Sequence, residues 1–381
     1  MKRILIYDTS VKGHHLEYLH HIYMATEDVE AEFIFVMPEE YNFVKNNLLW
    51  PTRHNVSFDF ISNSEIERIG GGYLKKRWYL AKLAAKYIKK SKADEVFFIE
   101  LIIQFPFLPL LIPNRVQVSG ILYRLVPYEW KYLSTLKKIK DAIEICTIGK
   151  SLTIKTPMCL NDNSCACFYN KKLGVSKFVS IVDPVNILNY QPKSIRNEIG
   201  ASSKDKIILH IGGMCERKGT LLLLEAANMM EESKLKNFIF VFAGQIGDDI
   251  KTKFEEDIDK LRKKARVVVY EGFCSYFFLS DLSFSCDCIV IPYKNTSYSS
   301  GIIGYASIYG KTVIGPGEGL LGKIIRRNKI GVTMRNLNTD HLAEAILNID
   351  RNNIINSKYL SRHSVKSFQD TVIFALLRSC N

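Results

Sequence analysis

One stretch near the middle of the chain constrains the fold most, because it passes from apolar to glycine-rich to leucine-rich residues. It reads Ile207-Ile-Leu-His-Ile-Gly-Gly-Met-Cys-Glu-Arg-Lys-Gly-Thr220 and continues into the leucine-rich segment 221–230. This pattern predicts a buried strand, a glycine loop and the start of a helix. Backbone N–H groups and the helix dipole converge at such a junction, so the loop is a ready anion site. Arg217 and Lys218 add positive charge there.

Similar strand-and-loop segments follow toward the C-terminus. They are Phe242-Ala-Gly-Gln245, Val267-Val-Val-Tyr-Glu-Gly-Phe273, Cys288-Ile-Val-Ile-Pro292, Ser297-Tyr-Ser-Ser-Gly-Ile-Ile-Gly-Tyr-Ala306 and Gly310-Lys-Thr-Val-Ile-Gly-Pro316. In this order they resemble the nucleotide-sugar-binding half of the GT-B glycosyltransferases, specifically the large retaining group of family 4. The resemblance covers roughly residues 205–335 and is thin before them.

Length and composition fit a protein of two domains. A chain of 381 residues with 47% hydrophobic content can form two cores. We therefore expect an α/β fold of two Rossmann-like, doubly wound domains, which the GT-B resemblance places on either side of a cleft. The expected ranges are 1–185 for an N-terminal acceptor domain and 186–360 for a C-terminal donor domain. The polar segment 185–203 marks the boundary, and the resemblance implies that a C-terminal helix, 361–381, crosses back to the first domain.

The donor site is implied by the loop at 212–219. In the resembling enzymes this loop reads glycine-arginine, a few residues, then lysine-glycine, and the arginine and lysine hold the donor diphosphate. Here Lys218 fits, Gly213 stands at the arginine position, and Arg217 is the nearest substitute. The resemblance implies that Gly212 and Gly213 contact the donor, and that Lys218 and Arg217 act catalytically by offsetting charge on the departing diphosphate. An exposed lysine in a first helical turn is the alternative.

Two glutamates of the family pattern are missing. The family carries them eight residues apart, near the donor sugar and the ribose, and Ser297 and Tyr305 occupy those positions here. The phenol of Tyr305 can still hydrogen-bond a ribose hydroxyl, with less strength than a carboxylate. The missing glutamates also fit an inactive subunit that binds a donor.

Three further segments are assigned to the donor site. Ser299-Ser300-Gly301 begins a predicted helix and can either bind phosphate oxygens or cap the helix without a ligand. Together with Lys218 it would form a two-sided diphosphate clamp. The turn at Phe273 and Cys274 is expected to meet the base. Glu318 is either an acceptor for a sugar hydroxyl or an ordinary loop carboxylate.

The first domain supplies acceptor-side candidates. The predicted strand Lys2–Tyr7 leads into the turn Asp8-Thr-Ser-Val-Lys-Gly-His-His15, so Gly13, His14 and His15 follow a strand end, where doubly wound sheets bind ligands. Ordinary surface or core histidines fit the same pattern. In the resembling family this loop lies across the cleft from the donor diphosphate, which implies an acceptor-side position for all three residues and a catalytic part for His14.

Other predicted strands of the first domain lie at 31–37, 56–61, 96–99 and 116–123. Arg124 follows the last of them, where it could meet a phosphate or an acceptor carboxylate. An ordinary salt bridge is the alternative. The segment 96–112 is apolar but is interrupted by Glu100, Gln104 and two prolines, so it falls short of the roughly 20 apolar residues that a membrane span requires.

Residues 73–92 combine aromatic and basic side chains. The apolar members are Tyr73, Leu74, Trp78, Tyr79, Leu83 and Tyr87, and the cations are Lys75, Lys76, Arg77, Lys82, Lys86, Lys89, Lys90 and Lys92. Their spacing predicts a helix with one apolar and one cationic face. This helix can lie on an anionic membrane surface, in keeping with the formal net charge of +13, or pack its apolar face on the sheet. No nucleic-acid-binding motif accompanies the charge, so nucleic acid is not an expected partner.

The nine cysteines predict free thiols in a reducing compartment. They follow no predicted secretory leader, because the apolar run 4–7 is far too short for one. The pairs at Cys165 and Cys167 and at Cys286 and Cys288 suggest core packing more than a zinc site, and no metal is assigned. We expect a cytoplasmic protein, with a peripheral position on the inner membrane face as a further option.

The resemblance implies transfer of a sugar, such as a hexose, from a nucleotide-diphosphate sugar to a glycan or lipid-linked acceptor, with retention and without a metal or other cofactor. Assembly of cell-surface polysaccharide is the expected setting. Two other functions stay open: an inactive donor-binding subunit, and a nucleotide-sugar epimerase of GT-B type. An epimerase needs acid and base residues in the cleft, and the second domain has few candidates for them.

Overall fold

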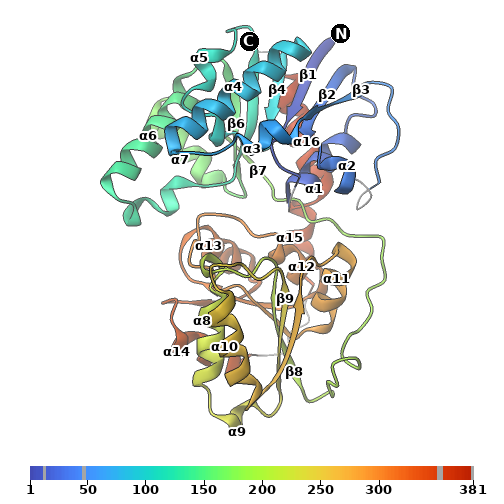
Figure 1. Cartoon of the computed structure of the whole chain (residues 1–381), viewed down its shortest axis with the longest axis vertical. Helices are drawn as coiled ribbons and strands as arrows, with labels where there is room; N and C mark the ends of the chain where they lie inside the picture. Colours follow the sequence, from blue (N-terminus) through green and yellow to red (C-terminus); the bar gives the residue numbers. More distant parts are fainter. Residues whose placement is uncertain (12–13, 45–48, 350–354, 379–381) are drawn as a thin grey trace. The chain divides into compact units, whose positions relative to one another are not determined.

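The computed structural model describes residues 1–11, 14–44, 49–349 and 355–378. These residues form two compact α/β units (Figure 1). Unit 1 comprises Met1–Asp183 together with Val365–Asn381, and unit 2 comprises Pro184–Ser364.

The described residues of unit 1 form a seven-stranded parallel sheet in the order β3-β2-β1-β4-β5-β6-β7. The strands are β1 Lys2–Tyr7, β2 Ala31–Pro38, β3 Val56–Ile61, β4 Glu95–Phe98, β5 Gln117–Leu122, β6 Ile154–Leu160 and β7 Val179–Ile181. The α-helices are α1 His14–Met24, α2 Tyr41–Val44, α3 Asn63–Glu67, α4 Tyr73–Ser91, α5 Leu108–Leu111, α6 Thr135–Lys150, α7 Asn163–Leu173 and α16 Val365–Leu377. β6 was not among the predicted strands, because Pro157 interrupts its apolar pattern.

The described residues of unit 2 form a six-stranded parallel sheet in the order β10-β9-β8-β11-β12-β13. The strands are β8 Lys206–Ile211, β9 Phe238–Gly244, β10 Arg266–Glu271, β11 Cys288–Val290, β12 Thr312–Pro316 and β13 Gly331–Met334. The α-helices are α8 Thr220–Met229, α9 Glu232–Leu235, α10 Lys251–Arg262, α11 Tyr276–Ser285, α12 Ile302–Tyr309, α13 Gly319–Asn328, α14 Thr339–Leu347 and α15 Ser357–Arg362. A short 3-10 helix, η5, spans Glu216–Lys218.

Buried apolar strands form the centre of each unit. All seven residues of β9 are buried, and so are the last five of β8. Parallel strands that helices cover on both faces show such continuous apolar runs, which is why the sequence marks them clearly. The predicted fold class, two doubly wound α/β units, is confirmed.

The strand orders locate the point in each sheet where ligands are expected. The order reverses between β1 and β4 in unit 1 and between β8 and β11 in unit 2. Open α/β sheets bind ligands beyond the carboxyl ends of the strands at such a reversal, because the connecting loops diverge there and leave space.

The C-terminal segment forms two helices. The single helix expected over 361–381 is interrupted, because the chain turns between α15 and α16. At this break, Val185 N donates to His363 O at 2.7 Å. α16 then packs in unit 1, where Phe368 and Val372 are fully buried in the core.

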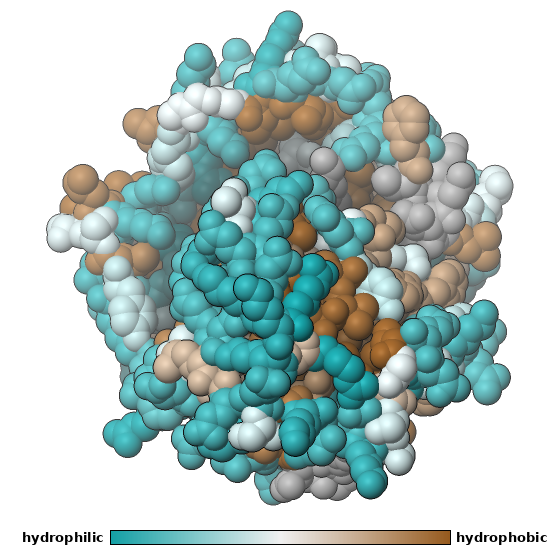
Figure 2. Space-filling model, turned by 60° about the horizontal axis from the view of Figure 1, so that its bottom comes forward, coloured by the Kyte–Doolittle hydropathy of each residue, from teal (hydrophilic) through white to brown (hydrophobic). Residues whose placement is uncertain are grey.

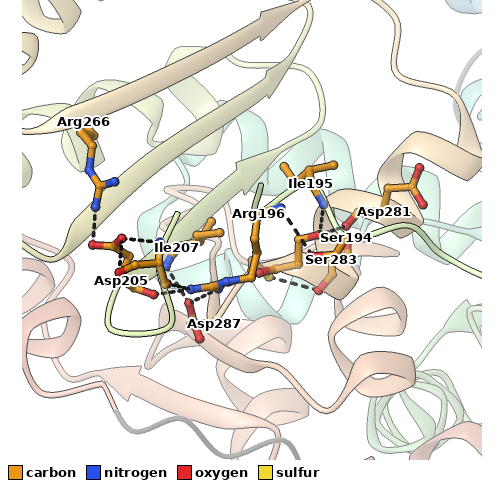
Figure 3. Close-up of polar contacts among 12 residues, drawn as sticks. Ser194, Ile195, Arg196, Asp205, Ile207, Arg266, Asp281, Ser283 and Asp287 are labelled. Carbon is orange, nitrogen blue, oxygen red and sulfur yellow. Dashed lines mark hydrogen bonds and ion pairs between the residues drawn. The ribbon is translucent and has the colours of Figure 1, made fainter. Parts of the chain in front are cut away.

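The expected linker 185–203 belongs to unit 2, and Arg196 holds it there (Figure 3). One guanidinium nitrogen donates to Ser285 O at 3.1 Å and to Asp287 Oδ2 at 3.0 Å. The other donates to Asp205 O at 2.6 Å. The linker contains no helix or strand. Polar contacts of this kind hold it to unit 2, which explains its polar composition.

The structure resolves the two interpretations of α4 in part. Of the predicted apolar face, Leu83 and Tyr87 are buried and Tyr73 and Tyr79 are half-buried, so the face packs inside unit 1 toward the end of the helix. Leu74 and Trp78 at the helix start remain 63% and 42% exposed. Among the described residues, no helix is long and apolar enough to cross a membrane.

Hydrophilic side chains cover most of the face drawn in Figure 2, around an apolar patch.

Candidate functional site

The loop after β8 has a conformation that requires glycine. Gly212 has a φ of 98°, and a Cβ atom there would lie 2.9 Å from Lys218 Nζ. Gly244, at the end of β9, has a φ of 141°, and its Cβ would lie 2.1 Å from Gly212 O. The two glycines let neighbouring strand ends approach closely and let the lysine reach back over the loop.

A third glycine joins this loop to the neighbouring strand at the reversal of strand order. Gly219 has a φ of 69°, and a Cβ atom there would lie 2.0 Å from the carbonyl oxygen of Pro292, which follows β11. Lys294 N donates to Arg217 O at 3.0 Å, and the Lys294 side chain forms an ion pair with Glu216. The loops after β8 and β11 are therefore fixed to each other.

Tyr293 connects the two halves of the expected diphosphate clamp. Lys218 Nζ lies 5.4 Å from the centroid of the Tyr293 ring, and Ser300 Oγ donates to the Tyr293 hydroxyl at 3.4 Å. Ser300 and Tyr293 are both buried, and Ser299 and Gly301 are half-buried. The structure thus brings both Lys218 and Ser300 to the side chain of Tyr293.

His210 in β8 is buried beside the loop. Its Nδ1 lies 2.9 Å from Val290 O and its Nε2 lies 3.0 Å from Thr220 Oγ1. Because a carbonyl oxygen can only accept, Nδ1 carries the proton and Nε2 accepts from the Thr220 hydroxyl. Burial lowers the pKa of His210 to about 4, so the ring is neutral at neutral pH. The imidazole ties β8, β11 and the first residue of α8 together.

The loop after β12 packs on the loop after β11. Leu320 N donates to Thr296 O at 2.7 Å. A Cβ atom on Gly319 would lie 2.0 Å from Thr296 Oγ1, so glycine is required at this position too. Glu318 precedes α13 in this loop and is exposed.

The two positions of the missing glutamates differ in their surroundings. Ser297 is fully buried, and its Oγ donates to Asn295 Oδ1 at 2.8 Å. Its hydroxyl and amide both bind that side chain, so Ser297 stabilises the turn after β11. Tyr305 lies in α12 and is half-buried.

The turn expected to meet the base follows β10 at the sheet edge. Gly272 N donates to Gly244 O at 3.2 Å, which connects this turn through β9 to the loop after β8. Phe273 is 81% exposed. Cys274 is half-buried, and burial raises the pKa of its thiol.

In unit 1, Asp8 is buried at the end of β1 and organises the first loop. Its Oδ1 accepts from the amides of Thr9 and Ser10 at 2.7 and 3.2 Å, and its Oδ2 lies 2.7 Å from His15 Nδ1. Burial alone lowers the pKa of His15, but the Asp8 carboxylate outweighs this effect and the pKa is raised. The contact also fixes the orientation of the imidazole ring.

Aromatic rings support His15 from the other side. The His15 ring stacks on Tyr123 with 5.4 Å between centroids, and Tyr123 stacks on Tyr18 at 5.9 Å. The Tyr18 hydroxyl donates to Asp183 Oδ1 at 2.5 Å. Glu100, which follows β4, has a pKa raised by burial. The ends of β1, β4 and β5 thus contribute to one group of polar and aromatic side chains.

The remaining acceptor-side candidates lie in different surroundings. His14 has a side chain that is 51% exposed, with Nδ1 3.6 Å from Glu17 Oε2. Arg124 donates to both oxygens of Asp141 at 3.0 and 2.8 Å and to Glu129 Oε2 at 2.8 Å. These contacts correspond to the ordinary salt bridge that was the alternative role for Arg124. Gly13 lies outside the described residues.

Sequence reasoning did not select His210, Tyr293 or Asp8. His210 interrupts an otherwise apolar strand, which is a signal for a buried and satisfied histidine. Asp8 follows a strand end directly, which is another usable signal. The role of Tyr293 depends on a contact with a residue far away in the chain, so no local pattern shows it.

The described residues contain no group of three or more side chains suited to hold a metal ion.

Residues 192–363 match the model of a family described as glycosyl transferases group 1. The matched residues make up nearly all of unit 2. An uncharacterised glycosyltransferase of Methanocaldococcus jannaschii is 24% identical over 218 residues, which are 56% of this chain and 51% of that protein. The chain thus spans about half the length of this curated relative.

Solved structures resemble the whole chain. Anabaena HepE in complex with UDP-glucose has a TM-score of 0.70 at 14% identity, with 99% of each chain covered. WaaG, a glycosyltransferase involved in lipopolysaccharide biosynthesis, has a TM-score of 0.69 at 14% identity, with 100% of each chain covered. At this identity the likeness establishes the fold, and the predicted GT-B fold is confirmed.

Proposed function

We propose that this protein transfers a sugar from a nucleotide-diphosphate sugar to a glycan or lipid-linked acceptor. The observation that carries the proposal is the glycine-built loop of the region that matches the group 1 family, in which Lys218 and the start of α8 meet at the reversal of strand order. That is where a diphosphate binds in a doubly wound sheet. The binding of UDP-glucose by the similar HepE structure supports this choice of donor class.

The donor diphosphate would bind between Lys218 and the turn Ser299–Gly301. Lys218 supplies a full charge, and the bare backbone at Gly212 and Gly213 permits close approach of phosphate oxygens. Arg217 is exposed beside the lysine and supplies a second cation. We assign the base to the turn at Phe273 and Cys274, the ribose to Tyr305 and the sugar hydroxyls to Glu318.

Catalysis would rest on electrostatic support of the leaving group. As the bond between the sugar and the diphosphate breaks, negative charge grows on the diphosphate, and Lys218 stabilises it there. We propose that no metal or other cofactor takes part and that the transfer retains the anomeric configuration. On the acceptor side we favour His15 over His14, because the carboxylate of Asp8 fixes the ring of His15.

The acceptor class and setting are also part of the proposal. We propose a hexosyl donor and an acceptor of cell-surface polysaccharide. The basic charge of the chain supports a cytoplasmic position at the inner membrane face. The similarity to WaaG agrees with an acceptor of this kind.

A panel of UDP-, GDP- and ADP-sugars tests the proposal. The purified chain should gain thermal stability with one donor and should hydrolyse it slowly or transfer the sugar to an added glycan acceptor. Lys218→Ala should remove both effects, whereas Lys236→Ala, an exposed lysine of the same unit, should leave them unchanged. A chain that shows no thermal shift with any donor would overturn the proposal.

One observation favours a second candidate, a subunit that binds the donor without turnover. The buried Ser297 occupies the position of a family glutamate and already binds Asn295. In that case the same panel would give a thermal shift without hydrolysis or transfer with any acceptor.

A further inference from the structure

Helix α6 exposes an apolar stripe to solvent. Leu136, Ile139 and Ile143 are 81%, 53% and 51% exposed, and their spacing places them on one face of the helix. The opposite face carries Ile145 and Ile148, which are buried in unit 1. α6 is therefore apolar on both faces, although only one face packs on the protein. An exposed stripe of this kind marks an interaction surface.

The charges around this stripe have one sign. Residues 130–150 contain five lysines, namely Lys131, Lys137, Lys138, Lys140 and Lys150, and none of them is fully buried. The two acidic residues of the same segment, Asp141 and Glu144, are both buried. Asp141 is bound by Arg124, and burial raises the pKa of Glu144 to about 8, so it is largely neutral at neutral pH. The charge on this surface is therefore positive.

The start of α4 continues the surface. Lys140 Nζ of α6 lies 3.3 Å from the centroid of the Tyr73 ring, and Arg77 Nη2 of α4 lies 3.6 Å from Glu144 Oε1. These contacts place the start of α4, which also carries the exposed Leu74 and Trp78, beside α6.

Further exposed apolar side chains precede α6 and extend from α5. Trp130 and Tyr132 are exposed just before α6, and Leu110 of α5 is exposed next to Phe107, on which the Trp78 ring packs edge-on at 5.4 Å. Figure 1 shows α6, in teal, on the flank of unit 1. We define the α6 surface as Leu74, Trp78, Leu110, Trp130, Tyr132, Leu136, Ile139 and Ile143 with the five lysines.

We propose that the α6 surface docks unit 1 onto an anionic lipid bilayer. Apolar side chains with aromatic rings at their margin enter the boundary between headgroups and acyl chains, while the surrounding lysines meet the anionic headgroups. Each lysine near such a surface strengthens binding about five-fold. An acidic protein partner could also match the charge of the lysines. Tryptophan and tyrosine next to an apolar, cationic stripe favour the bilayer, because these side chains have an apolar ring and a polar group that suit its boundary with water.

This surface differs from the one expected from sequence alone. The apolar face expected within residues 73–92 is buried or half-buried at four of its six residues, and the other two, Leu74 and Trp78, join the α6 surface. The docking inference does not rest on the proposed transferase activity, since it uses no residue of the donor or acceptor sites.

Co-sedimentation with vesicles of phosphatidylcholine, alone or mixed with phosphatidylglycerol, tests the inference. The purified full chain should bind the mixed vesicles and not the neutral ones. The variant Leu136→Gln with Ile139→Gln should bind roughly ten-fold more weakly. The variant Lys137→Gln with Lys138→Gln should bind about 25-fold more weakly, five-fold for each lysine. The matched controls are Phe374→Gln for an exposed apolar residue of α16 and Lys89→Gln with Lys92→Gln for exposed lysines of unit 1.

Both α6 variants change solvent-exposed or half-exposed side chains, and an unchanged circular dichroism spectrum and melting temperature will show that they fold. Failure of the native chain to bind mixed vesicles overturns the inference, and so does equal binding by the α6 variants and the controls. Size-exclusion chromatography without lipid adds a further outcome: a native dimer that the α6 variants convert to a monomer assigns the surface to a second copy of the chain. A donor-dependent thermal shift, measured in parallel, reports on the donor site separately.

Discussion

The two strand-end sites of this chain are built by different means. In unit 2, glycines at positions 212, 219, 244 and 319 let four backbone segments pack against each other without side chains between them. In unit 1, the buried carboxylate of Asp8 and a stack of aromatic rings hold His15 in place. The first construction is suited to bind a large anion with backbone and lysine, whereas the second presents one oriented titratable ring.

The largest effect is expected where the backbone packing of unit 2 is closest. Gly219→Ala puts a Cβ atom 2.0 Å from Pro292 O at a φ of 69°. We expect unit 2 to lose about 3 kcal/mol or more of stability. Hydrogen exchange of the amides in β8 and α8 measures this loss separately from unit 1. The control Gly213→Ala adds a Cβ that meets no atom within 4 Å, so it should be nearly neutral. Similar exchange in both variants would contradict the role given to glycine.

Lys218→Ala separates the charge of the loop from its shape. The backbone of the loop is fixed by glycines and by Lys294, so this variant should fold normally. Turnover of the donor should fall about a hundred-fold to a thousand-fold, the usual effect of removing one group that stabilises transition-state charge. Steady-state kinetics with the donor found in the panel measures it, and Arg217→Ala should have a smaller effect. Near-normal turnover would mean that the donor site lies elsewhere.

The pH dependence of unit 2 tests the neutral state of His210. Its pKa is lowered to about 4, so between pH 6.5 and 4 the unfolded chain takes up a proton that the folded chain does not. Stability is therefore lost as the pH falls through this range, by roughly 3 kcal/mol in full. Hydrogen exchange of β8 at several pH values measures the loss. His210→Gln should flatten the dependence of stability on pH. His54→Gln, at an exposed histidine, should leave this dependence unchanged. A flat profile in the native chain would contradict a buried neutral imidazole.

The same contrast explains what could be predicted from the sequence. The strands of both units, the loop at Gly212 and Lys218 follow from local patterns, because buried parallel strands and glycine turns leave continuous traces in the sequence. β6, which contains a proline, and the short strand β13 were missed. The contact between Lys218 and Tyr293 joins residues of two loops, and the support of His15 by Tyr123 joins β5 to α1. Side-chain partners of this kind depend on tertiary packing, which no single segment records.

Asp8→Asn gives the smallest expected effect and tests the unit 1 site alone. The amide keeps one oxygen for the amides of Thr9 and Ser10, so the loop should retain its conformation. It removes the negative charge beside His15, so the pKa of His15 should fall below its native value, as NMR titration of the ring would show.

Because Asp8 also fixes the ring, we expect the KM for the acceptor to rise several-fold, while the KM for the donor stays unchanged. His14→Gln serves as the control, since the His14 side chain is half exposed and its Nδ1 lies 3.6 Å from Glu17 Oε2. A rise in the donor KM would place Asp8 in the donor site instead. If His14→Gln raised the KM for the acceptor by the same factor, the preference for His15 would be contradicted, because the ring orientation fixed by Asp8 would then make no difference to acceptor binding.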